Sequence, residues 1–133
     1  LEKMISTNLY SAYHLTRGLI GDMIKRKSGH IFNICSTASI TPYVDGGAYC
    51  ISKYALYGMT KVLREEMKEY NVKVTAVLPG ATLTSSWDEE SVSSDKLMKA
   101  EDVAEAVFNA YSLSKNTVVE EILMRPQRGD IVD

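Results

Sequence analysis

The chain has 133 residues, of which 45% are hydrophobic and 24% charged, the size and composition of about one soluble globular domain. Its 15 basic and 17 acidic residues leave a net charge of −2 without a basic block, which argues against a nucleic-acid partner. No apolar run approaches the roughly 20 residues that span a bilayer, and no signal peptide is visible, so we expect no membrane partner and a cytoplasmic location. Cys35 and Cys50 lack metal-site and disulfide spacing, which predicts buried, reduced thiols and no metal.

The first part of the sequence predicts a helix followed by a strand. Residues 2–27 carry an apolar stripe at helical spacing, which consists of Met4, Asn8, Ala12, Leu15 and Leu19. Asn8 is the polar member of the stripe, and on this stretch alone a solvated helix margin explains it better than a polar site. The apolar run over 30–35 then predicts a buried parallel strand, and Pro42 with two glycines predicts a loop over 41–47.

The second part repeats the alternation. It predicts a helix over 47–70, a strand over 72–78 that ends at Pro79-Gly80, a helix over 99–113 and a strand over 117–124. The core positions predicted for the helix over 47–70 are Leu56, Met59, Val62, Leu63 and Met67. Residues 81–99 have no period and are rich in Ser, Asp and Glu, which predicts a long loop around Trp87. Residues 125–133 form a polar tail.

This alternation predicts an α/β fold in which helices cover a parallel sheet. Only three strands are predicted, however, and the first would leave an apolar edge without a neighbour. The sequence also begins inside a helical pattern without a capping residue. We therefore expect residues 1–133 to be the carboxyl-terminal part of a single larger α/β domain.

Ser36, Tyr49 and Lys53 form the candidate catalytic group. Ser36 follows the predicted strand over 30–35, whereas Tyr49 and Lys53 lie in the first turns of the helix over 47–70. Ligands of open α/β sheets bind at the carboxyl ends of the strands, so we expect the three side chains to meet there.

The spacing Tyr-x-x-x-Lys is by itself a weak indication. It occurs three times, as Tyr49/Lys53, Tyr57/Lys61 and Tyr111/Lys115. Position favours the first pair, because Tyr57 lies about 12 Å further along the helix at 1.5 Å per residue and Tyr111 closes its own helix. The other two pairs are therefore predicted to be structural.

These residue types suit proton transfer to a carbonyl oxygen. A free phenol has a pKa of about 10, and a nearby ammonium favours its ionised form. A serine hydroxyl can hold the carbonyl oxygen while the phenol supplies the proton. The hydride that completes the reduction comes from no side chain, so a cofactor is implied.

Three segments together resemble the short-chain dehydrogenase/reductase family, whose members are Rossmann-type enzymes that use NAD or NADP. The segments are Asn33-Ile34-Cys35-Ser36, Tyr49-Cys50-Ile51-Ser52-Lys53-Tyr54-Ala55 and Pro79-Gly80-Ala81-Thr82-Leu83-Thr84. Ser36 precedes Tyr49 by 13 positions, the family's usual separation, and Asn8 falls where the family has a helix asparagine. The resemblance covers nearly the whole chain. It implies the second half of a doubly wound sheet, whose last helix crosses to the opposite face by a left-handed connection.

The resemblance implies a role for each matching residue. Tyr49 would be the general acid in reduction and the base in oxidation, Ser36 would position the substrate oxygen, and Lys53 would favour the phenolate and bind the nicotinamide ribose. Asn8 would hold a water that extends the proton relay, which reverses the interpretation from the helix pattern alone. The residues expected to bind the cofactor, besides Tyr49 and Lys53, are Pro79, Gly80, Thr82 and Thr84. Of these, the Thr82 backbone would meet the nicotinamide carboxamide, and Thr84 the carboxamide or the pyrophosphate.

The expected partners are a small carbonyl or alcohol substrate and further copies of the chain. The two long helices carry more apolar residues than one sheet face needs, among them Leu9, Tyr10 and Tyr13, and the family commonly forms dimers and tetramers through such helices. Within the family we lean towards a 3-oxoacyl-carrier-protein-reductase-like enzyme. The alternative is a non-catalytic fragment or a binding or regulatory module on the same fold.

Two observations limit these expectations. The family's glycine-rich phosphate loop, Gly-x-x-x-Gly-x-Gly, is absent, so we expect this chain alone to bind the cofactor poorly or not at all. A hydrolase built on Ser36 or Cys35 with His14 or His30 is disfavoured, because the sequence has no Gly-x-Ser-x-Gly elbow. His30 would also lie at the far end of its strand from Ser36.

Overall fold

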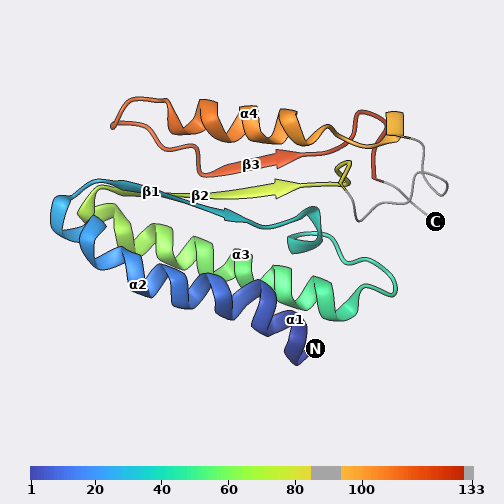
Figure 1. The fold of residues 1–133 in the computed structure, drawn as a ribbon, viewed down its shortest axis with the longest axis horizontal. Helices are drawn as coiled ribbons and strands as arrows, with labels where there is room; N and C mark the ends of the chain where they lie inside the picture. Colours follow the sequence, from blue (N-terminus) through green and yellow to red (C-terminus); the bar gives the residue numbers. More distant parts are fainter. Residues whose placement is uncertain (85–93, 131–133) are drawn as a thin grey trace.

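The computed structural model describes residues 1–84 and 94–130, and it has three layers (Figure 1). A parallel sheet of three strands in the order β1-β2-β3 separates α2 and α3 on one face from α4 on the other. The strands are β1 (Gly29–Ile34), β2 (Val72–Pro79) and β3 (Glu121–Met124). The expected α/β architecture with a parallel sheet is confirmed.

The helices follow the predicted order, with an irregular turn near the amino terminus. The predicted first helix consists of α1 (Glu2–Ile5), the π-helical turn η1 (Ser6–Tyr10) and α2 (Ser11–Arg26). The other long helices are α3 (Gly47–Met67) and α4 (Ala100–Tyr111). Three short 3-10 turns complete the described helices: η2 (Thr37–Ser39), η3 (Lys68–Tyr70) and η4 (Ser94–Lys96).

Both sheet crossovers step in the same direction across the sheet, yet α3 and α4 lie on opposite faces (Figure 1). The two crossovers therefore have opposite hand, although parallel crossovers are right-handed in about 98% of cases. The family resemblance implied this exception, which general rules of topology disfavour.

The central strand β2 carries the core. Val74, Ala76 and Val77 are fully buried, and the free thiols of Cys35 and Cys50 are buried as well. β1 and β2 are aligned from the pair Gly29 and Val72 to the pair Ile34 and Val77. Their carboxyl ends therefore meet at the same edge of the sheet.

β3 is shorter than the predicted strand over 117–124. It pairs with only the last four residues of β2, from the pair Ala76 and Glu121 to the pair Pro79 and Met124. Before that point, side chains of α3 and β2 bind main-chain oxygens of the segment over 114–120. The bonds run from Lys73 to Ser114, from Thr75 to Val119 and from Arg64 to Glu120. The Glu120 oxygen also accepts from the Ala76 N–H at 3.0 Å, so backbone bonding to β2 begins one residue before β3.

The apolar stripe predicted for the first helix is wrong in part. Met4, Leu15 and Leu19 are 40%, 65% and 51% exposed. The residues that pack on the core from this helix are instead Leu9, Ala12, Ile20, Met23 and Ile24. The helix carries apolar side chains on two faces, and its π-helical turn shifts the register of everything after Tyr10. On α3, Val62 is also exposed rather than buried, whereas Leu56 and Met67 lie in the core as predicted.

None of the described helices is long and apolar enough to cross a membrane. The described residues also contain no group of three or more His, Cys, Asp or Glu side chains arranged to hold a metal ion.

Candidate active site

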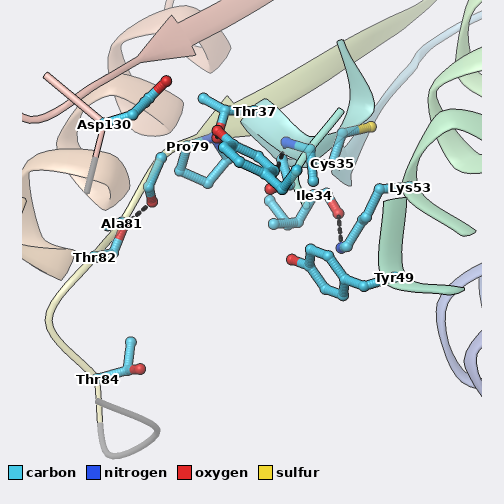
Figure 2. A pocket seen from close by; sticks show the side chains of 14 residues that line it. Ile34, Cys35, Thr37, Tyr49, Lys53, Pro79, Ala81, Thr82, Thr84 and Asp130 are labelled. Atoms are coloured by element: carbon cyan, nitrogen blue, oxygen red, sulfur yellow. Dashed lines mark hydrogen bonds between the residues drawn. The ribbon is translucent and has the colours of Figure 1, made fainter. Parts of the chain in front are cut away.

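A cleft of about 630 Å³ opens at the carboxyl edge of the sheet, where β1 and β2 end. Ser36, Tyr49 and Lys53 all line it, and so does the segment after β2, through Pro79, Gly80, Thr82 and Thr84. Figure 2 shows Tyr49 and Lys53 on one side of the cleft and Thr82 and Thr84 on the other. Of the predicted site residues, only Asn8 does not line this cleft.

Ser36 is held by the turn that follows β1. It is the N-cap of the turn Thr37–Ser39, and its Oγ accepts a hydrogen bond from the Ala38 N–H at 3.0 Å. Its side chain is nearly buried, at 9% exposure for the residue. Because the oxygen already accepts from the backbone, the hydroxyl proton points to another acceptor, and none of the described residues takes it. Ser36 can therefore donate to a substrate oxygen from a fixed position.

Tyr49 and Lys53 lie on the first turns of α3, one turn apart. Lys53 Nζ donates to the main-chain oxygen of Ile34 at 3.0 Å and lies 5.8 Å from the centroid of the Tyr49 ring (Figure 2). Burial lowers the pKa of the Lys53 ammonium below its usual value, and the electrostatic influence of Cys35 offsets part of this shift. Tyr49 stays 39% exposed, so its phenol is accessible from the cleft.

Asn8 reaches the site indirectly, through a second buried serine. Its Nδ2 donates to Ser52 Oγ at 2.9 Å, and Ser52 Oγ donates to the main-chain oxygen of Tyr49 at 2.7 Å. Asn8 lies in the π-helical turn, a type of irregularity that is often found at functional sites. The polar amide thus faces α3 rather than solvent, and its role in holding a water stays a prediction.

The segment after β2 is packed closely against the end of β3. Gly80 N–H donates to the Met124 oxygen at 2.7 Å. A Cβ on Gly80 would lie 3.2 Å from Pro126 Cδ and 3.3 Å from the same oxygen. Thr82 Oγ1 donates back to the Gly80 oxygen at 2.9 Å, and Thr82 forms a β-bridge with Met98. A side chain at position 80 would therefore crowd the end of β3, and its neighbours would have to shift by a few tenths of an ångström.

The two other Tyr-x-x-x-Lys pairs do not line the cleft. The Tyr57 hydroxyl donates to the Glu121 carboxylate on β3, and burial together with Glu121 raises the pKa of Tyr57 to about 12. Lys61 Nζ lies 4.9 Å from the Tyr57 ring centroid. Tyr111 lies at the end of α4, with its ring 6.0 Å from that of His30. Their contacts are those of structural residues.

Among the cleft-lining residues that sequence reasoning missed are Tyr43 and Asp130, which come from irregular segments. Tyr43 comes from the loop before α3, and its hydroxyl donates to Thr37 Oγ1 at 2.9 Å. Asp130 comes from the polar tail and pairs with Arg125 at 3.5 Å. Neither lies in a periodic segment, so no local pattern marks them. Trp87, around which the sequence predicts a long loop, lies outside the described residues.

The sequence of this chain is similar to those of known proteins. The family model of the short chain dehydrogenases matches residues 1–96. Sepiapterin reductase from Chlorobaculum tepidum is 38% identical over 130 residues, which make up 97% of this chain and 53% of that protein.

Solved structures show the same fold. A metagenomic short-chain oxidoreductase in complex with NADP superposes with a TM-score of 0.75 at 32% identity, over 92% of this chain and 49% of that one. The closed form of a serine dehydrogenase complexed with NADP+ gives a TM-score of 0.87 at 27% identity, over 99% of this chain and 58% of that one. The chain thus spans about half the length of these relatives.

The family match covers more than half of the chain and includes Asn8, Ser36, Tyr49, Lys53 and Gly80. It leaves the hydrolase alternative without support, because short-chain dehydrogenases are oxidoreductases. The chain belongs to the short-chain dehydrogenase family and has its Rossmann-type α/β fold.

Proposed function

We propose that the protein containing this chain transfers a hydride between NAD(P)(H) and a carbonyl or alcohol substrate, with Tyr49 as general acid and base. One observation carries the proposal. Ser36, Tyr49 and Lys53 line a single cleft at the carboxyl edge of the sheet, and the Lys53 ammonium lies 5.8 Å from the Tyr49 ring. Carbonyl reduction requires three groups from the protein: a hydrogen-bond donor, an acid, and a positive charge that stabilises the conjugate base of that acid. Ser36, Tyr49 and Lys53 can supply them in that order.

Each residue has a distinct task in this proposal. In reduction, Tyr49 Oη gives its proton to the carbonyl oxygen, and the Ser36 hydroxyl donates a hydrogen bond to that oxygen. Lys53 stabilises the phenolate that remains, and its bond to the Ile34 oxygen keeps the ammonium in place. In oxidation the same groups act in the opposite sense, with Tyr49 as the base. Asn8 holds a water that passes the proton onward from Lys53.

The residues present suit the nicotinamide end of the cofactor. Pro79, Gly80, Thr82 and Thr84 form the wall of the cleft that faces Tyr49 and Lys53, and Gly80 is packed tightly against the end of β3. When bound, the cofactor supplies or accepts the hydride. Two of the relatives described above were solved with NADP or NADP+, which favours NADP over NAD.

We further propose that residues 1–133 form the carboxyl-terminal half of a Rossmann-type domain. Among the described strands, β1 has a neighbour on one side only, and the matched relatives are about twice as long. A homodimer or homotetramer is proposed on the basis of the exposed apolar side chains of α2 and α3. They are Tyr13, Leu15 and Leu19 on α2 and Ile51, Tyr54 and Val62 on α3.

The candidate substrates come from the sequence and from the names of the relatives. The sequence favours a 3-oxoacyl-carrier-protein-reductase-like activity, but none of the three relatives described above carries that name. Their names instead suggest adding sepiapterin and serine to a test panel that also contains a 3-oxoacyl thioester.

The test uses the full-length protein with NADPH or NADH and this panel, and follows the absorbance of the reduced nicotinamide. Tyr49→Phe should lower kcat by at least ~100-fold, because general acid–base catalysis contributes that much, while NADPH binding is retained. Tyr57→Phe is the matched control, since it removes the phenol of the second Tyr-x-x-x-Lys pair on the same helix, and it should keep wild-type turnover. Turnover that survives Tyr49→Phe would refute the proposal. Cofactor binding without turnover on any substrate would favour a binding module.

A further inference from the structure

Ser39 was not among the predicted site residues, yet its hydroxyl joins two of them. The backbone N–H of Ser36 donates to Ser39 Oγ at 3.2 Å, and Ser39 Oγ donates to the main-chain oxygen of Lys53 at 2.8 Å. The hydroxyl therefore accepts one hydrogen bond from Ser36 and donates one to Lys53, the two residues of the proposed catalytic group that it contacts. Ser39 itself is 0% exposed, so no water competes for these bonds.

The two residues that Ser39 joins come from different elements. Ser36 follows β1, whereas Lys53 lies on α3 and is separated from the turn by an irregular loop that includes Val44, which is 92% exposed. Such a loop does not by itself fix the turn relative to the helix. The bond from Ser39 to Lys53 crosses this gap directly.

We propose that Ser39 is a positioning residue that sets the Ser36 hydroxyl relative to Tyr49 and Lys53, a role that rests on the proposed carbonyl chemistry. Ser39 touches neither the cleft nor the reacting atoms, since it does not line the cleft. It acts through Ser36, whose N–H it binds while the Ala38 N–H binds the Ser36 oxygen. The backbone N–H and the side-chain oxygen of Ser36 are thus both bonded within one turn, and Ser39 bonds that turn to the main-chain oxygen of Lys53.

Loss of the Ser39 hydroxyl should cost turnover more than binding. In Ser39→Ala the Ser36 N–H has no partner and the turn loses its bond to α3, so the Ser36 oxygen is free to shift. A misplacement of about 1 Å at a reacting group can cost ~100-fold in rate, and we expect kcat to fall at least ~10-fold. The KM for NADPH should stay at the wild-type value, because the segment from Pro79 to Thr84 is not altered.

Thr60→Val is the matched control. Thr60 is also 0% exposed and also lies at a buried bond between two elements, since its Oγ1 accepts from Asn33 Nδ2 at 3.0 Å and donates to the Leu56 oxygen at 2.7 Å. Each substitution removes one buried hydroxyl and leaves one buried donor unpaired. Only Ser39 binds catalytic residues, so Thr60→Val should keep kcat within about twofold of wild type at temperatures where both variants are folded.

The experiment measures kcat and KM of the full-length wild type, Ser39→Ala, Thr60→Val, Ser36→Ala and the double variant Ser36→Ala/Ser39→Ala. Because Ser39 acts through Ser36, adding Ser39→Ala to Ser36→Ala should change kcat by less than about twofold. Hydrogen exchange of the Ser36 amide, read in parallel, should be faster in Ser39→Ala and unchanged in Thr60→Val.

The outcomes separate the inference from the function on which it rests. An active wild type whose kcat survives Ser39→Ala, or falls equally in Thr60→Val, would overturn the positioning role. A Ser36 amide that exchanges at the same rate in Ser39→Ala as in the wild type would also overturn the positioning role, whether or not the enzyme turns over any substrate. A wild type without turnover on the whole panel would overturn the proposed function, and the catalytic purpose of Ser39 with it.

Discussion

Replacing Lys53 by methionine removes the ammonium beside Tyr49 and keeps a long apolar side chain in its place. In the structure the Lys53 Nζ lies 5.8 Å from the Tyr49 ring centroid. With the ring centroid taken as the centre of the phenolate charge and an effective dielectric constant of about 20, unit charges at that separation attract by about 3 kcal/mol, which corresponds to roughly 100-fold in rate. We therefore expect kcat of Lys53→Met to fall by roughly 100-fold at neutral pH.

The assay is steady-state turnover of the full-length protein, with kcat separated from KM because Lys53 is also proposed to bind the nicotinamide ribose. Lys53→Arg serves as a control that keeps the charge.

The same substitution should leave stability nearly unchanged. It loses the hydrogen bond to the Ile34 oxygen, worth about 1 kcal/mol, but also removes a charge that burial disfavours. A folded Lys53→Met variant that keeps more than about a third of the wild-type kcat at neutral pH would show that the charge does not assist Tyr49 and would refute the reasoning.

Three further measurements test other parts of the account. Gly80→Ala sets a Cβ 3.2 Å from Pro126 Cδ and 3.3 Å from the Met124 oxygen, so urea denaturation should show a loss of about 1–2 kcal/mol, whereas Gly58→Ala, with nothing within 4 Å, should be neutral or stabilising. His30 has its pKa lowered to about 4 by burial and by Lys73, so as the pH falls from 6.5 to 4 the unfolded state takes up a proton first and stability drops. We expect a drop of about 1–2 kcal/mol, discounted because the ring is partly exposed, and it should be missing in His30→Gln. Titration of the isolated 133-residue chain with NADPH and NADH should show no micromolar binding, because the chain lacks a glycine-rich phosphate loop; micromolar binding would contradict this requirement.

The position of the site could be predicted from the sequence because it depends on the ends of elements. Ser36 follows an apolar run that forms a buried strand, and Tyr49 opens a helix, so the parallel sheet brings both to its carboxyl edge. The same argument separates Tyr49 from Tyr57, whose contacts lie outside the cleft. The residue-level roles of Asn8, Ser36, Tyr49 and Lys53 remain predictions.

Other features depend on tertiary contacts that periodicity does not contain. The first helix has apolar residues on two faces, so the pattern could not show that Leu9 and Ala12 face the core while Leu15 faces solvent. The bond from Arg64 on α3 to the Glu120 oxygen, just before β3, is likewise a contact that no local pattern shows. Ser39 had a local indication in its spacing from Ser36, typical of a capping box, but its bond to Lys53 appears only in the folded chain.

The structure of the full-length protein with NADP and an unreactive carbonyl analogue tests the central claim most directly. The account predicts that the carbonyl oxygen lies within about 2.6–3.2 Å of both Tyr49 Oη and Ser36 Oγ, with Lys53 still bound to the Ile34 oxygen. A carbonyl oxygen bound away from both hydroxyls, in an ordered and active enzyme, would contradict it.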